Sequence, residues 1–366
     1  MVASPATPRS VIESLLRALV DLGGSDLHVK AGVAPRVRID GRLRALSMEP
    51  LTAARTEAIA AAVMRADQVG QFASSNEADF AYTIEGLGRF RVNAFRQRGD
   101  VGLVFRRVAV GAIPLTELGL PEVLASLALQ PRGMILVTGP TGSGKTTTLA
   151  GMVDHINKNR DVHIVTIEDP IEVIHNDFRA MVDQREVRVD TADFFVAMRA
   201  AMRQDPDVIL VGEMRDPETV RAALSAAETG HLVLSTLHTA DAAETVARIL
   251  DFFPLSEQKQ VRIALAGSLR AIISQRLVAR ADGEGRCVGV EVAIVTGRIA
   301  DAITDPKKTS TITQLIAEGS FYGMQTFDQH LTTLFRDSVI TLDEAMAASS
   351  NPHDLEVELR RLGLVA

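Results

Sequence analysis

The sequence reads Gly139-Pro140-Thr141-Gly142-Ser143-Gly144-Lys145-Thr146-Thr147-Thr148 between an apolar run, 134–138, and a segment with helical spacing, 149–156. Strand, glycine-rich loop and helix in this order, with the spacing G-x-x-x-x-G-K-[ST], are typical of a loop that wraps a phosphate chain. Its glycines permit backbone angles that turn N–H groups inward, and the helix adds its positive N-terminal end. Lys145 would reach the β- and γ-phosphates, and the Thr146 hydroxyl would hold Mg²⁺. The alternative is a strand-to-helix turn that binds nothing, but both flanks fit a nucleoside triphosphate site.

Length and composition favour a globular protein of two domains. The chain has 366 residues, of which 46% are hydrophobic and 23% are charged. Its formal net charge is −7, so no overall positive field attracts nucleic acid or anionic lipid. Cys287 is the only cysteine, which excludes an internal disulfide and a cysteine-rich zinc site. No apolar run has the length of a membrane span and the first residues do not resemble a secretory leader, so the cytosol is the expected compartment.

Residues 1–112 are expected to form a small α+β domain. Residues 1–10 read as an irregular leader, and Asp40-Gly41 between two short alternating runs predicts a hairpin turn. Helices are predicted by apolar spacing at 11–20 and 52–72, and strands by alternation at 25–29, 35–43 (the hairpin), 79–84, 88–95 and 101–106.

From residue 113 the pattern changes to buried strands alternating with helices, which predicts a mainly parallel sheet with helices on both faces. The predicted strands are 133–138, 162–168, 207–212, 231–237 and 288–295. Beyond Thr296 the chain reads as short helices at 312–318, 327–335, 342–348 and 354–362.

Arginine is concentrated between residues 89 and 107, where Asp100 is the only acid. Most of these arginines are expected to lie on a solvated sheet face. Arg91 and Arg106 are singled out because they lie on adjacent predicted strands and each follows a Phe. A planar guanidinium suits phosphate charge, and the loop already has its own lysine. The two arginines are therefore candidates for fingers supplied across a subunit interface.

Carboxylates follow two of the predicted strands. Strand 162–168 leads into Glu168, Asp169 and Glu172, at the edge of the sheet where ligands of doubly wound folds bind. One of these carboxylates is expected to orient or deprotonate the attacking water, although strand-end solvation is the other explanation. The strand 207–212 is followed by Glu213, with Gly212 where an Asp is usual, so Glu213 would contact Mg²⁺, directly or through water.

Two histidines bracket the strand 232–237. The odd spacing of His231 and His238 points them to opposite faces, which argues against joint metal ligation. His238, at the carboxyl end of the strand, is a candidate sensor of the γ-phosphate by a hydrogen bond. The other reading is a structural histidine with its own partners.

Together these motifs resemble the secretion-type ATPase superfamily of type IV pilus and type II secretion motors, and within it the twitching-motility PilT family of pilus retraction ATPases. The similarity extends from Ser25-Asp-Leu-His28 to about Leu334. Besides the glycine-rich loop, it is carried by Arg89-Phe-Arg-Val-Asn-Ala-Phe95, Thr166-Ile-Glu-Asp-Pro-Ile-Glu172, Asp183-Gln-Arg-Glu186, Asp205-Pro-Asp-Val-Ile-Leu-Val-Gly-Glu-Met-Arg-Asp216 and Thr229-Gly-His-Leu-Val-Leu-Ser-Thr-Leu-His-Thr239.

The resemblance implies an α/β protein with a PAS-like N-terminal domain, 1–112, and a RecA-like P-loop ATPase domain with C-terminal helices, 113–366. It implies a homohexamer that uses ATP and Mg²⁺ to withdraw pilin from a pilus. The implied partners are an inner-membrane platform protein and a paralogous pilus ATPase, but no nucleic acid. The protein would then be cytoplasmic and docked on the inner-membrane pilus machinery.

The same resemblance assigns roles to individual residues. Glu172 would be the catalytic base and Glu213 the acid of the second motif, sharing the metal with Thr146. Arg91 and Arg106 would reach a nucleotide across domains or subunits, and His231 and His238 would be the pair of the histidine motif. The nucleotide would be held by Gly139, Pro140, Thr141, Gly142, Ser143, Gly144, Lys145, Thr146 and Thr147.

Two departures bear on the direction of the motor. Retraction members carry Ala-Ile-Arg-Asn-Leu-Ile-Arg-Glu near the C-terminus, whereas the matching stretch here, 298–305, keeps the apolar frame and loses most of the charges. Asp183 also stands where the family has Asn. Against extension motors, the chain lacks their long N-terminal region and four-cysteine zinc insert.

Three other functions stay open at this point. One is a pilus extension or type II secretion ATPase. Another is a DNA-translocating ring, which the clustered arginines favour and the aromatic content of 4% with no Trp disfavours. The last is an assembly module that binds ATP and barely hydrolyses it, suggested by Gly212.

Overall fold

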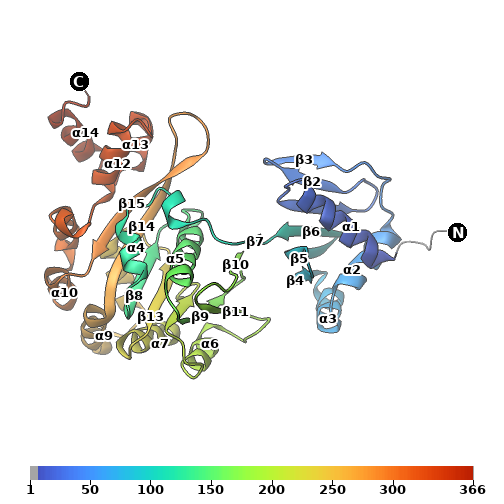
Figure 1. Cartoon of the computed structure of the whole chain (residues 1–366), viewed down its shortest axis with the longest axis horizontal. Helices are drawn as coiled ribbons and strands as arrows, with labels where there is room; N and C mark the ends of the chain where they lie inside the picture. The colour runs from blue at the N-terminus through green and yellow to red at the C-terminus, as the bar shows by residue number, and fades with distance from the viewer. Residues whose placement is uncertain (1–6, 366) are drawn as a thin grey trace. The chain divides into compact units, whose positions relative to one another are not determined.

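The computed structural model describes residues 7–365, and they divide into two compact units with the boundary between Val110 and Gly111 (Figure 1). Each unit has its own hydrophobic core. Among the described residues, none of the helices combines the length and the apolar character needed to cross a lipid bilayer.

The first unit is an antiparallel sheet of six strands in the order β3-β2-β1-β6-β5-β4. Its elements are α1 (Pro8–Asp21), β1 (Asp26–Lys30), β2 (Arg36–Ile39), β3 (Arg42–Ala45), α2 (Ala53–Val63), α3 (Ala66–Ser75), β4 (Glu77–Ile84), β5 (Gly88–Gln97) and β6 (Asp100–Arg107), followed by the short β7 (Ala109–Val110). Ile12 and Leu16 of α1 and Ile59 of α2 pack with Leu27 and Phe105 of the sheet. The helices thus cover one sheet face.

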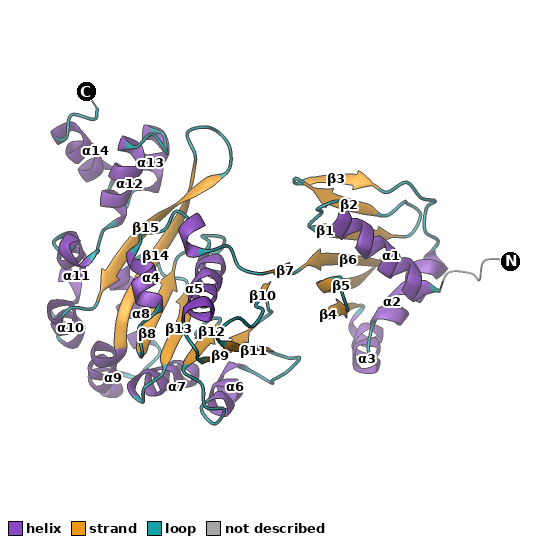
Figure 2. Cartoon of the chain, in the orientation of Figure 1, coloured by secondary structure: helices purple, strands orange, loops and turns teal. Residues whose placement is uncertain are grey.

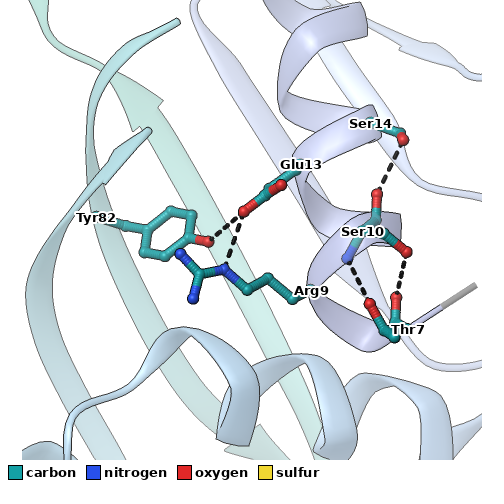
Figure 3. A network of polar contacts seen from close by, with 6 residues as sticks. All are labelled: Thr7, Arg9, Ser10, Glu13, Ser14 and Tyr82. Atoms are coloured by element: carbon teal, nitrogen blue, oxygen red, sulfur yellow. Dashed lines mark hydrogen bonds and ion pairs between the residues drawn. The ribbon is translucent and has the colours of Figure 1, made fainter. Parts of the chain in front are cut away.

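Polar contacts fix the start of α1 (Figure 3). The Thr7 hydroxyl accepts the N–H of Ser10 at 3.1 Å and so caps the helix. One turn further, the Glu13 carboxylate accepts from Arg9 at 3.0 Å and from the Tyr82 hydroxyl of β4 at 3.4 Å. The hydroxyl contact ties the helix to the far edge strand of the sheet.

Two sequence-based expectations in this unit are wrong. The helix begins at Pro8, within the expected leader, while residues 1–6 of that leader lie outside the described residues. The single helix expected at 52–72 is two helices, because Met64 and Arg65 have extended backbone and Gln68 accepts the N–H of Arg65 to start α3. The hairpin at Asp40-Gly41 is confirmed: both residues have positive φ, 48° and 76°, as a tight two-residue turn requires.

The second unit contains a seven-stranded sheet in the order β11-β9-β12-β13-β8-β14-β15, in which β15 alone runs antiparallel. The strands are β8 (Gly133–Thr138), β9 (His163–Glu168), β11 (Met181–Glu186), β12 (Val208–Val211), β13 (Leu232–Leu237), β14 (Leu269–Ala279) and β15 (Arg286–Ile294), and a short β10 (Val173–Ile174) lies outside this sheet.

Helices cover both faces of this sheet (Figure 2). On one face, residues of α4 (Val123–Ala128) and α5 (Lys145–Asn159) pack on Ile135 and Val137. On the other face, residues of α6 (Phe194–Ala201), α7 (Pro217–Glu228), α8 (Ala242–Asp251) and α9 (Leu255–Ser268) pack with Met134 and Leu136. The predicted fold class, an α+β domain followed by a P-loop α/β domain with C-terminal helices, is confirmed.

Two strands of this sheet were absent from the sequence prediction. The pattern predicts helices between 237 and 288, yet residues 269–279 form β14, which pairs with β8 and β15 and is mostly buried. The edge strand β11, Met181-Val-Asp-Gln-Arg-Glu186, is mostly polar and has no clear apolar alternation. The expected strands 133–138, 162–168, 207–212, 231–237 and 288–295 are all present with small shifts of their ends.

Short helices follow the sheet: α10 (Gly297–Thr304), α11 (Ile312–Ala317), α12 (Phe327–Arg336), α13 (Leu342–Ala348) and α14 (Pro352–Arg361), with 3₁₀ turns at Thr309–Thr311 and Ser320–Tyr322. A further 3₁₀ turn, Leu115–Glu117, precedes the sheet. Leu331, Ala345 and Leu355 of α12, α13 and α14 form a separate small core with Val278 of β14. His330 of α12 joins this core to the sheet, because its Nδ1 accepts the N–H of Val290 at 2.9 Å.

Burial lowers the pKa of His330 to about 4. A protonated imidazole cannot accept the Val290 N–H, so the stability that this group contributes is present above its unfolded pKa, about 6.5, and is lost as the pH falls toward 4. We expect the Tm of the wild type to fall more steeply between pH 6.5 and 4 than that of His330→Gln, whose amide oxygen accepts the same N–H without titrating. Thermal unfolding followed by circular dichroism measures this, with the exposed His353→Gln as control. Equal slopes for the wild type and His330→Gln would contradict it.

Candidate nucleotide-binding site

The turn between β8 and α5 has a backbone that glycine alone can adopt at its first residue. Gly139 has φ 139°, and a Cβ there would lie 2.3 Å from the carbonyl oxygen of Gln275 on β14. Gly144, with φ 92°, precedes the first residue of α5, Lys145. The loop is therefore pressed against the neighbouring strand, and the first N–H groups of α5 are presented beside it.

Lys145 is folded back over this loop. Its Nζ donates to the carbonyl oxygens of Gly139 at 2.8 Å and Pro140 at 2.9 Å. Burial lowers its pKa, while the nearby charge of Glu213 acts in the opposite direction. The ammonium also lies 3.5 Å from Nδ1 of His238. A cation held at the loop in this way is positioned to contact an anion that the loop wraps.

A cavity of about 660 Å³ opens at this loop, large enough for a nucleotide. Its walls come from the loop and from the carboxyl ends of β9, β12 and β13, as the strand-end rule predicts. Of the loop residues assigned to the nucleotide, Gly139, Pro140 and Ser143 do not line the cavity. Those that do are Thr141, Gly142, Gly144, Lys145, Thr146 and Thr147.

The three carboxylates after β9 differ in their surroundings. Glu168 is largely buried and accepts from the Thr166 hydroxyl at 2.7 Å and from Nε2 of Gln184 at 3.1 Å. Burial raises the pKa of Glu168. Asp169 lies 3.5 Å from the guanidinium of Arg188. Glu172 is exposed and lines the cavity, so it is the carboxylate of the three with the freest access to water there.

Glu213 connects the second acidic motif to the histidine motif. It forms an ion pair with Arg215, and its other oxygen lies 3.7 Å from Nε2 of His238. His238 therefore stands between Lys145 and Glu213 at the edge of the cavity. A side chain at Gly212 would crowd the neighbouring strand, since a Cβ would lie 3.3 Å from the carbonyl oxygen of Ile167. This crowding gives a steric reason for glycine at the position where an acid was expected.

The donors around Thr146 suit a magnesium ion that a nucleotide brings. Among the described residues no group of three His, Cys, Asp or Glu side chains could hold a metal by itself. Thr146 and Glu213 nevertheless line the same cavity. Mg²⁺ commonly takes one or two protein oxygens together with waters and substrate phosphates, so these two residues fit such an ion.

The remaining residues singled out in the sequence lie elsewhere. His231 precedes β13, at the end of the strand opposite the cavity, and its Nδ1 lies 3.0 Å from the carbonyl oxygen of Ala226. Arg91 and Arg106 belong to the first unit and stand opposite each other on β5 and β6, as their predicted strands implied. The exposed Arg106 donates to the buried Asp26 at 2.8 Å.

Several residues that line the cavity were not singled out in the sequence. Phe194, Arg215, Leu277 and Arg286 are among them. Arg215 follows Glu213 by two positions within the motif 205–216, so this motif is the signal in the sequence that points to Arg215. Leu277 lies on β14, a strand that the sequence pattern does not predict, and Arg286 is the first residue of β15, just before the predicted strand 288–295.

The comparisons with known proteins agree with this geometry. The profile of the type II/IV secretion system protein family matches residues 5–334. The type IV pilus retraction ATPase PilT of Pseudomonas aeruginosa is 44% identical over 94% of this chain and 99% of its own length. The type IV pilus ATPase PilU of the same organism is 43% identical over 95% of this chain and 91% of its own. A crystal structure of the pilus retraction motor PilT with bound ADP superposes with a TM-score of 0.87, covering 94% of this chain and 98% of that one at 44% identity.

We expect Gly139→Ala to weaken ADP binding by at least about tenfold, because the new Cβ would collide with the Gln275 carbonyl and displace the loop from its phosphate-binding geometry. Isothermal titration calorimetry with Mg-ADP measures this. Gly267→Ala is the matched control, since a Cβ there meets nothing within 4 Å. Unchanged affinity in Gly139→Ala folded protein would show that the loop does not bind the nucleotide as described.

Proposed function

The chain belongs to the type II/IV secretion system protein family and, within it, to the PilT-type pilus retraction ATPases, and we propose that it hydrolyses ATP to drive retraction of type IV pili. The observation that carries the proposal is the pairing of full-length similarity to PilT with a cavity where the glycine-rich loop, Glu172, Glu213 and His238 meet. The fold alone would serve many other P-loop proteins.

The proposed chemistry assigns one task to each of these groups. The loop N–H groups and Lys145 hold the β- and γ-phosphates. Glu172, exposed in the cavity, orients and deprotonates the attacking water. His238 contacts the γ-phosphate, and Thr146 and Glu213 hold Mg²⁺, directly or through water. When bound, Mg²⁺ neutralises the charge that develops on the phosphates.

The assembly is part of the same proposal. We infer a homohexamer in which Arg91 and Arg106 of one subunit act on the nucleotide of a neighbouring subunit. Both side chains are exposed, as such a role requires. The ring would dock on an inner-membrane platform protein at the cytoplasmic side, with a paralogous pilus ATPase as a further partner. His231, turned away from the cavity, would act outside the chemical step.

The stretch 298–305, which bears on direction, lies almost wholly in α10. Ile299, Ala302 and Ile303 are buried, and Arg298 pairs with Glu318 at 2.9 Å. The apolar frame of the retraction motif thus serves packing. Retraction is proposed on similarity over the whole chain, which outweighs the lost charges of this one helix.

We expect Glu172→Gln to release phosphate from ATP at least about 100-fold more slowly than the wild type while it still binds ATP, because the amide cannot take a proton from water. Steady-state phosphate release with Mg²⁺, and binding of a fluorescent nucleotide, measure the two effects. Lys145→Ala should lose both, and Glu228→Gln, an exposed carboxylate outside the cavity, should lose neither. Wild-type protein without Mg-dependent turnover would refute the ATPase proposal.

Hexamers assembled from two different variant subunits test whether Arg106 acts on the nucleotide of a neighbouring subunit. Arg106→Ala and Lys145→Ala subunits are each expected to be inactive alone. A mixture should regain activity, because an intact Arg106 on a Lys145→Ala subunit can serve the intact loop of its neighbour. Arg107→Ala, which removes the adjacent exposed arginine on β6, should be active without mixing. Mixtures that stay as inactive as the single variants would contradict an action across subunits.

A further inference from the structure

We propose that Glu291 of β15 is a positioning residue that fixes the loop between β13 and α8 and, through it, holds His238 at the nucleotide cavity. The proposal rests on the proposed role of His238 at the γ-phosphate. Neither the sequence motifs nor the assigned chemistry uses this carboxylate.

Strand register places Glu291 in the same row of the sheet as the last residues of β13 and β8, which precede the loop that carries His238 and the phosphate loop. Leu237 pairs with Thr138, Thr138 pairs with Ser274, and Ser274 pairs with Glu291. These four residues form one row across the sheet, on the face that α8 covers. Leu237 directly precedes His238, and Thr138 directly precedes Gly139. Strands β13 and β8 therefore both end at this row. The loop between β13 and α8, called the histidine loop here, starts directly after it, and so does the phosphate loop after β8.

The carboxylate of Glu291 reaches the histidine loop directly. Glu291 is 3% exposed, and its Oε1 accepts the N–H of Ala242, the first residue of α8, at 2.8 Å. The Ser274 hydroxyl lies 3.4 Å from the same oxygen. An N–H in the first turn of a helix has no partner within the helix, and a carboxylate there also meets the positive end of the helix dipole.

Apart from the contacts of the His238 side chain with Lys145 and Glu213, the other hydrogen bonds of this loop to described residues stay within the loop and α8. Asp241 accepts the N–H of Glu244 at 2.8 Å, the Glu244 carboxylate accepts the N–H of Ala240 at 2.7 Å, and the hydroxyls of Thr239 and Thr245 lie 2.7 Å apart. These contacts shape the loop but do not join it to the sheet. The bond from Glu291 does, so the loop is held by β13 at its beginning and by β15 at its end.

A buried carboxylate is costly to keep, and its retention at this place calls for a reason. Burial raises the pKa of Glu291 to about 7, with the nearby Asp241 acting in the same direction and the Ala242 N–H, the Ser274 hydroxyl and Arg276 acting against it. An apolar residue would avoid the desolvation cost. It would also leave the Ala242 N–H unpaired at the start of α8.

Comparing the affinity for ADP with that for an ATP analogue distinguishes a positioning role of Glu291 from a role in packing alone. The loop after β8 holds the β-phosphate of both ADP and ATP, whereas His238 is proposed to contact the γ-phosphate alone. Glu291→Ala should therefore weaken binding of a non-hydrolysable ATP analogue about tenfold and lower kcat by a similar factor, with ADP affinity within about twofold of the wild type. Glu291→Gln, which keeps an acceptor oxygen for Ala242, should restore most of both losses.

The double variant tests whether the effect passes through His238. In a His238→Ala background, Glu291→Ala is expected to change analogue affinity and kcat less than twofold, because the group that it positions is already absent. Equal fold-losses in the two backgrounds would overturn the proposal. So would an equal loss of ADP and analogue affinity, which would mark a general structural role.

His330→Ala is the matched control, because it removes the buried acceptor of the neighbouring residue Val290 on the side of the C-terminal helices. It should leave the ratio of analogue to ADP affinity unchanged. If Glu291→Ala does not fold, Glu291→Asp takes its place, since the shorter side chain withdraws the oxygen from Ala242 and keeps the charge. The affinities for the analogue and for ADP are measured without turnover. Wild-type protein that binds but does not hydrolyse ATP would therefore refute the proposed function and leave the binding test of Glu291 intact.

Discussion

The carboxyl ends of four parallel strands, β8, β13, β12 and β9, lie along one edge of the sheet, and the whole nucleotide cavity depends on this alignment. Each strand delivers one kind of group at its end: the glycine-rich loop, His238, Glu213 and the carboxylates around Glu172. None of these groups would meet another without the pairing of the strands. Because the strands are buried on both faces, a displacement of one would disturb two cores as well as the cavity.

The antiparallel strands β14 and β15 lie next to β8 and contact the segments that follow β8 and β13 at this edge. The backbone of Gln275 lies against Gly139, and its side-chain Nε2 donates to the Thr148 hydroxyl of α5 at 2.8 Å. The next residue back, Ser274, faces the opposite side, where Glu291 meets the start of α8. Strand β14 thus lies directly against the phosphate loop, and it is connected to the start of α8 through Glu291 of β15. The residue after Gln275, Arg276, contacts the C-terminal helices: its guanidinium lies over the ring of Phe327 of α12 at 4.0 Å.

On the sheet face of the first unit that the helices leave uncovered, Arg106 and Arg38 both pair with one buried acid, Asp26. Asp26 is 4% exposed and accepts from Arg106 at 2.8 Å, with Arg38 of the next strand at 3.7 Å. The hydrogen bonds from Arg106 and Ser25 lower the pKa of Asp26 against the opposing effect of burial. A guanidinium held at its root in this way keeps much of its surface exposed, 69% for the Arg106 side chain, and is presented in one orientation.

Patterns that depend on neighbours along the chain could be read from the sequence. The phosphate loop, the hairpin at Asp40-Gly41, five strands of the larger sheet and the approach of Glu172, Glu213 and His238 to one edge follow from spacing and from the strand-end rule. The division of the helix near Met64 could not be read, because Ala-rich composition favours helix on both sides of it. Strand β14 was missed because its short apolar run fits a helix as well as a strand until its partners β8 and β15 are known.

The sequence by itself determined that this chain has a phosphate loop on a parallel sheet, since glycine spacing and apolar periodicity are local properties of the chain. Only the tertiary structure decided which carboxylate after β9 is free in the cavity, that His231 is turned away from it, and that Glu291 lies beneath the histidine loop. Those outcomes depend on burial, on strand order and on register between residues far apart in the chain, and side-chain burial and pairing are set by packing that no local pattern records.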